Sequence, residues 1–67
     1  MIPTRIRFYE LSDDGGKTYI SDYNSYMIPH LGSDIKLNGM KYFVIDIIID
    51  YENLGTCVDI TLEKVNE

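Results

Sequence analysis

The sequence predicts an all-β fold, a small five-stranded barrel in a single domain spanning residues 1–67. Three observations lead to this prediction. The stretch from Tyr42 to Tyr51, YFVIDIIIDY, is dominated by β-branched residues, which lower helix propensity and favour strands. An Asn-Gly pair at positions 38–39 indicates a tight hairpin, because a type I′ turn needs positive φ at both central residues. Short strand-like segments separated by turn-forming residues lie on both sides of these features.

The first part of the chain predicts a hairpin followed by a long loop. The segment RIRFYEL, residues 5–11, places Ile6 and Phe8 on one face of a strand. The turn-forming run SDDGG follows it, and KTYIS, residues 17–21, is expected to return as a second, shorter strand. Residues 22–33 are the least regular part and contain a proline and a glycine. We expect them to form a long loop with at most one helical turn.

Two further hairpins are expected to share one long strand. The Asn-Gly turn directs Met40 and Val44 toward the core, whereas a second turn at residues 52–55 directs Ile47 inward, opposite Ile60. Because side chains alternate along a strand, these two inward sets are out of phase by one residue. The conflict predicts a β-bulge in the central strand, which also supplies the bend that a small barrel requires.

The bulge is expected near Ile45 and Asp46, and it explains why the most apolar stretch of the chain carries carboxylates. Beyond the bulge, Asp46 and Asp50 point away from the core and keep the outer face of the sheet hydrated. The same register places Cys57 opposite Asp50 on that outer face. We therefore expect the thiol of Cys57 to be exposed.

The predicted order of a hairpin, a long loop and a three-stranded meander resembles that of Src-homology-3-like barrels. The segment that carries this resemblance is IPHLGSDIKLNGMKYFVIDIIIDYE, and the resemblance extends over about residues 28–62. The same segment is similar to small accessory proteins of phages and mobile elements. The resemblance transfers no catalytic or binding residue. The chain has no tryptophan, so the proline-peptide binding of Src-homology-3 domains is not implied.

Composition and charge argue against several classes of protein. With 11 acidic and 6 basic residues, the chain carries a net charge of −5, whereas a nucleic-acid binder needs a basic face. No apolar run approaches the roughly 20 residues of a membrane span. The single cysteine, Cys57, excludes a disulfide within the chain. It favours a cytoplasmic location, which would be the host cytoplasm if the protein is phage-encoded.

No motif groups the residues that could carry catalysis or hold a cofactor. His30 lies in the expected loop and Cys57 in the last strand, and nothing in the sequence fixes them together as a nucleophilic pair. No glycine-rich phosphate loop occurs, and one cysteine with one histidine cannot form a zinc site. We therefore expect a non-enzymatic protein with no cofactor and no bound metal.

The outer face of the predicted meander is the first candidate binding surface. In the expected register Ile48 lies opposite Asp59, and Asp46 and Asp50 lie diagonally on either side of Asp59. One interpretation is a solvated acidic face. The other is a protein-binding patch in which Ile48 is the apolar anchor and the three carboxylates form a rim that selects the partner.

A group of tyrosines is the second candidate surface. Tyr19, Tyr23 and Tyr26 lie in and just before the expected loop. Tyrosine combines a rigid contact area with a hydroxyl and is enriched at protein interfaces. The alternative is that these side chains close one end of the barrel as part of its core.

These observations favour a non-enzymatic binding module whose partner is a host or phage protein. In this hypothesis a phage-encoded inhibitor or regulator binds a host factor. One alternative is a homo-oligomeric barrel that holds a small ligand, such as a nucleotide signal, in a basic pocket. Arg5, Arg7 and the four lysines are the only residues that could build such a pocket. A structural virion accessory protein is a further alternative.

Overall fold

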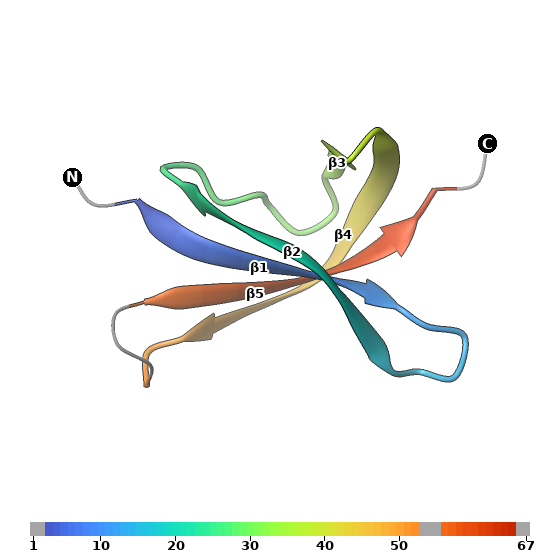
Figure 1. The fold of residues 1–67 in the computed structure, drawn as a ribbon, viewed down its shortest axis with the longest axis horizontal. Coiled ribbons are helices and arrows are strands. Elements are labelled where there is room, and N and C mark those ends of the chain that lie inside the picture. The colour runs from blue at the N-terminus through green and yellow to red at the C-terminus, as the bar shows by residue number, and fades with distance from the viewer. Residues whose placement is uncertain (1–2, 53–55, 66–67) are drawn as a thin grey trace.

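The computed structural model describes residues 3–52 and 56–65, which form a single mixed β-sheet (Figure 1). Its strands are β1 (Thr4–Leu11), β2 (Lys17–Ser25), β3 (Asp34–Leu37), β4 (Met40–Asp50) and β5 (Cys57–Lys64). They lie side by side in the order β2-β1-β5-β4-β3. The described residues include no helix. The predicted all-β class with five strands is therefore confirmed.

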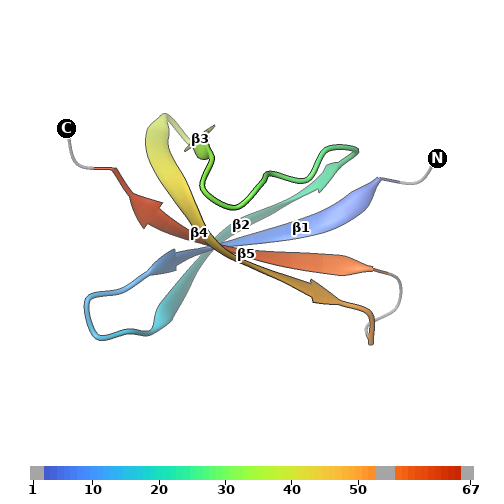
Figure 2. The ribbon, with the colours of Figure 1, turned by 180° about the vertical axis from the view of Figure 1, so that it is seen from behind.

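The two halves of the chain are joined by a parallel pairing of β1 with β5. Ile6 lies opposite Val58 and Phe8 opposite Ile60 in this pairing, while the other strand pairs are antiparallel. The sheet is strongly twisted, and its strands cross near the centre when viewed from either side (Figures 1 and 2). It curls into a half-barrel with β2 and β3 at its edges. This architecture is compatible with a Src-homology-3-like barrel, but β2 and β3 are not paired, so the expected closure is incomplete.

The Asn-Gly hairpin has the predicted register. Leu37 lies opposite Met40, and φ is 53° at Asn38 and 80° at Gly39. Positive φ at both positions is what a type I′ turn requires. The second predicted turn, at 52–55, lies largely outside the described residues, but Ile47 is opposite Ile60 as expected.

The predicted bulge in the central strand is present. Val44 pairs with Leu62 and Asp46 with Thr61, so Ile45 is the extra residue. The bulge turns Val44 into the core, where it is 0% exposed, and leaves Asp46 exposed on the convex face. This is the one-residue shift in the alternation of side chains that the two hairpins predicted.

The second strand is longer than predicted. Residues 22–25, which were expected to begin the loop, belong to β2 and pair with β1 as far as Thr4 opposite Ser25. Aspartate and asparagine, at positions 22 and 24, are depleted in strands, so the local sequence does not indicate this extension. Pairing with the full length of β1 outweighs that propensity. The loop of the structure is shorter and covers residues 26–33.

The core fills the concave side of the half-barrel. It consists of Ile6, Phe8, Leu37, Tyr42, Val44, Val58, Ile60 and Leu62. The central strand β5 supplies three of these side chains, each 0% exposed, because it is flanked by β1 and β4 along its length. Full burial of such aliphatic side chains contributes about 1.5–3 kcal/mol each. The packing on β5 is therefore a main source of stability in this small domain.

The prediction that Cys57 is exposed is wrong. Its register opposite Asp50 is as expected, but the side chain is 5% exposed. The physical reason is that β5 is the central strand. Cys57 lies between Asp50 on β4 and Arg5 on β1, and the neighbour on β1 could not be deduced from the meander alone.

We expect Val44→Asp to unfold the domain and Asp46→Asn to leave its stability nearly unchanged. An unpaired carboxylate at the fully buried site costs several kcal/mol, which is comparable with the whole unfolding free energy of a small domain. Urea denaturation followed by circular dichroism measures both effects. A cooperative transition of Val44→Asp at the wild-type midpoint would contradict the register.

We expect the Cys57 thiol to react slowly with a disulfide reagent such as Ellman's reagent in the folded protein and quickly in urea. Burial denies the reagent access to the sulfur, so labelling depends on opening of the strands that flank β5. The time course of labelling at increasing urea concentrations measures this. Equal rates in the folded and unfolded protein would show that Cys57 is not buried.

Candidate functional site

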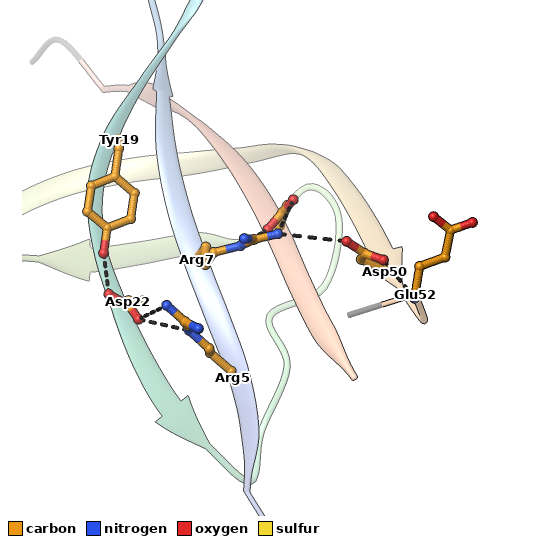
Figure 3. Close-up of polar contacts among 7 residues, drawn as sticks. Arg5, Arg7, Tyr19, Asp22, Asp50 and Glu52 are labelled. Carbon is orange, nitrogen blue, oxygen red and sulfur yellow. Dashed lines mark hydrogen bonds and ion pairs between the residues drawn. The ribbon is translucent and has the colours of Figure 1, made fainter. Parts of the chain in front are cut away.

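The convex face of the sheet carries a network of charged side chains that spans three strands. The Arg7 guanidinium, on β1, reaches across β5 (Figure 3). Its Nε donates to Asp59 Oδ1 at 2.5 Å and its Nη2 to Asp59 Oδ2 at 3.0 Å. The same Nη2 lies 3.9 Å from Asp50 Oδ2 on β4. This two-pronged geometry is the strong form of an arginine–carboxylate pair, and it raises the pKa of Arg7 above its usual value.

A second charged group lies beside it on β1 and β2. Arg5 donates from Nε to Asp22 Oδ2 at 3.0 Å, and the Tyr19 hydroxyl donates to Asp22 Oδ1 (Figure 3). The hydrogen bond from Tyr19, together with Arg5, holds the pKa of Asp22 below its usual value against the opposing effect of burial. The same hydrogen bond raises the pKa of Tyr19. Asp22 is therefore an ionised acceptor held by two donors.

The predicted patch around Ile48 has the expected geometry but a different charge. Ile48 lies opposite Asp59 and is 47% exposed, and Asp46 and Asp50 lie on the same convex face. Arg7, however, pairs with Asp59 and lies near Asp50, which offsets part of the negative charge. The alternation of arginine with apolar residues in RIRF was the signal for this cation. Its place beside the patch depends on the parallel pairing of β1 with β5.

A groove opens on the concave side between β2 and β3. It has a volume of about 400 Å³ and is lined by Ile6, Phe8, Tyr23, Asn24, Ser25, Met27, Pro29, Lys36, Leu37 and Asn38. Its apolar floor is formed by core residues of β1 and β3. The ring of Tyr23 packs edge-on against Phe8, with the ring centroids 6.0 Å apart. The groove is thus the open side of the half-barrel, where the core meets solvent.

The loop beside this groove exposes large apolar side chains. Met27 is 80% exposed, and Tyr26, Ile28 and Leu31 are also exposed. We call these four residues, together with Tyr23, the apolar loop face. Large exposed apolar patches on small proteins are typical of interaction sites, and Met27, Ile28 and Leu31 were not singled out by the sequence analysis. Their segment, MIPHL, has no strand or helix period that would distinguish surface from core.

Hydrogen bonds hold the loop in place at both ends. Ser25 Oγ donates to the Met27 carbonyl at 2.8 Å and accepts from the Met27 N–H at 3.1 Å. At the other end, Ser33 Oγ donates to the His30 carbonyl at 2.5 Å. The Gly32 N–H donates to the Val44 carbonyl at 2.9 Å, which attaches the loop to β4. The apolar loop face is therefore presented by a connection fixed to the sheet.

The three predicted tyrosines do not form one surface. Tyr23 and Tyr26 lie by the groove and loop, whereas the ring of Tyr19 packs against Tyr9 with centroids 5.8 Å apart. The cause is a bulge in β2, where Phe8 pairs with Ser21 but Tyr9 pairs with Tyr19. The extra residue, Ile20, reverses the phase of the strand. As a result Tyr19 joins the charged convex face.

No protein-family model, curated protein or solved structure matched the chain. Residues 3–52 and 56–65 contain no group of three or more histidine, cysteine or acidic side chains placed to hold a metal ion. In the same ranges, no helix has the length and apolar character needed to cross a bilayer. The candidate site therefore stands on geometry alone.

We expect the stability of Asp22→Asn to depend less on pH in the acid range than the stability of the wild type does. The folded-state pKa of Asp22 lies below its usual value of 3.8, so its ionised form stabilises the fold. That stabilisation is complete above the unfolded-state value and is lost as pH falls through the lower folded-state value. Urea midpoints measured between about pH 5 and pH 2 should fall less steeply in the variant than in the wild type.

Asp13→Asn is the matched control for this measurement. Asp13 is exposed in the turn between β1 and β2, and its carboxylate forms no hydrogen bond or ion pair with the described residues. Replacing Asp13 should leave the change of the urea midpoint with pH the same as in the wild type. If both variants alter the slope equally, the bonds from Tyr19 and Arg5 to Asp22 do not stabilise the fold.

Proposed function

We propose that this protein is a non-enzymatic binding module that holds a partner protein at the groove between β2 and β3. The observation that carries the proposal is the apolar loop face, which lies beside an open groove with an apolar floor. Met27 and three neighbours in the loop, Tyr26, Ile28 and Leu31, are exposed to solvent. Contact with a partner would remove them from water.

The groove has the make-up of a recognition site for an apolar side chain of a protein. The buried residues Ile6, Phe8 and Leu37 line it, and Asn24, Ser25 and Asn38 contribute polar residues to the lining. An apolar core with a polar rim is the usual anatomy of a protein interface. Met27 adds a flexible, polarisable wall that adapts to the shape of a partner.

The same groove is a poor match for the alternative ligand, a nucleotide signal. A phosphate group needs several cationic donors, and Lys36 is the cation among the described lining residues. Arg5 and Arg7 are on the convex face, where each is paired with an aspartate. A protein partner is therefore favoured over a nucleotide. That the partner is a host protein inhibited by a phage-encoded module stays a prediction, because it depends on the resemblance alone.

We expect Met27→Asp to weaken capture of the partner and Leu11→Asp to preserve it. Burying a methionine contributes about 1.5–3 kcal/mol, so its replacement by a carboxylate should weaken binding by about tenfold or more. Leu11 is a matched control because it is also exposed but lies at the far end of β1. Tagged wild type and variants are compared by quantitative affinity purification from lysate of the source organism, then by calorimetry with the purified partner.

The variant Ile48→Lys separates the groove from the convex face. Ile48 anchors the predicted patch on the convex side, so its replacement should leave groove binding intact. Loss of the partner in Ile48→Lys, with retention in Met27→Asp, would show that the convex patch and not the groove is the binding surface. Circular dichroism of each variant confirms that the fold is preserved.

A further inference from the structure

The distal half of β4 is a strand edge that β3 does not cover. β4 has 11 residues and β3 has 4, and β3 pairs only with Met40–Phe43. The loop extends this pairing by one step, through Gly32 and Ser33 to Val44. Beyond Val44, the described residues pair with β4 from the β5 side alone. We call residues 46–50 of β4 the open edge.

The open edge has the properties that favour addition of a strand. Alternate peptide groups along it point away from β5, as in any edge strand, and can accept a further ladder of hydrogen bonds. Its three central residues are isoleucines, which fit a pleated sheet well. Ile48 is 47% and Ile49 46% exposed, and both lie close to the end of β4. An added strand would place its own side chains next to Ile48 on the convex face and next to Ile49 on the concave face.

The charges at the two ends of the open edge specify which strand fits. Asp46 and Asp50 both project to the convex face, four residues apart, with Ile48 between them. Arg7 lies to the β5 side of Asp50, at 3.9 Å from Oδ2, and the Glu52 N–H donates to Asp50 Oδ1 at 2.9 Å. An added strand would approach this carboxylate from the side opposite Arg7. Residues directly opposite in paired strands have Cβ atoms about 5 Å apart. Basic residues at the first and fifth positions of the added strand would therefore meet the two carboxylates.

A second copy of the chain is a poor occupant of this edge. Two-fold antiparallel pairing centred on Ile48 would set Asp46 of each copy opposite Asp50 of the other. A shift of two residues would leave carboxylates as diagonal neighbours, which still interact. Each copy also carries a net charge of −5. Like charges facing one another are a common device against edge-to-edge association.

We propose that the open edge binds an extended segment of a partner protein with the pattern basic–apolar–apolar–apolar–basic. The outer two residues pair with Asp46 and Asp50, the central one covers Ile48, and the second and fourth extend the concave apolar surface beside Ile47 and Ile49. This surface is separate from the groove between β2 and β3. Binding at the open edge therefore does not depend on the function proposed for the groove.

The test uses the blocked peptide Ser-Lys-Val-Tyr-Val-Lys-Ser and the full chain labelled with ¹⁵N. Titration should shift and protect from hydrogen exchange the amides of residues 46–50. The peptide Ser-Glu-Val-Tyr-Val-Glu-Ser, which has the same apolar residues, should bind at least about tenfold more weakly. No shift of these amides with about 1 mM lysine peptide, or shifts confined to residues 26–31, would overturn the proposal.

Charge reversal on the protein provides the matched variant. Asp46→Lys, at an exposed position, should weaken binding of the lysine peptide by about tenfold and strengthen binding of the glutamate peptide. Asp13→Lys makes the same change of charge away from the open edge and should alter neither affinity by more than about twofold. Equal effects of the two variants would show that binding depends only on net charge, and this would overturn the proposal. A dimer in sedimentation equilibrium, with protection of the amides of residues 46–50, would also overturn it, because a second copy would then occupy the edge.

Discussion

The parallel pairing of β1 with β5 is the interaction on which the rest of the structure depends. Without it, the chain would be a two-stranded hairpin and a three-stranded meander, and an isolated hairpin is at best marginally stable in water. With it, β5 becomes a central strand whose Val58, Ile60 and Leu62 are each 0% exposed. Because β1 and β5 are far apart in sequence, the stability of this domain depends on a contact with a high cost in chain entropy.

The same pairing determines the chemistry of both faces. On the concave side it brings Ile6 and Phe8 against the core of the meander. On the convex side it places Arg7 beside Asp59, in register, so that a strand with outward arginines lies next to one with an outward aspartate. The face that looks acidic in the meander alone is thus a face of mixed charge. The charge of a candidate patch predicted from one hairpin can therefore be partly offset when a distant strand joins the sheet.

Local turn chemistry predicted the meander well, and non-local pairing explains what it could not predict. The positive φ of Asn38 and Gly39 fixes one hairpin, and the phase conflict between Val44 and Ile47 locates the bulge without any tertiary information. The burial of Cys57, the extension of β2 to Ser25 and the Arg7–Asp59 pair all depend on where β1 lies. No turn residue encodes that position, since no short connection joins β1 to β5. Tyr26 in the loop was predicted as a candidate, whereas Ile28 and Leu31 were not, because an irregular segment has no periodicity that separates inside from outside.

Both proposed binding surfaces follow from unequal strand lengths in an unclosed sheet. β3, with 4 residues, is too short to cover β4, with 11, and it does not pair with the 9-residue β2. One consequence is the groove between β2 and β3, and the other is the open edge beyond Val44. A closed barrel would satisfy these edges internally. Among the described residues, the half-barrel instead leaves an apolar floor at one place and a strand edge that β3 does not cover at the other. Tyr23 and Met27 are exposed beside the first, and Ile48 and Ile49 beside the second. That coincidence of open backbone and exposed apolar side chains is what distinguishes binding surfaces from the scattered apolar residues found on any small protein.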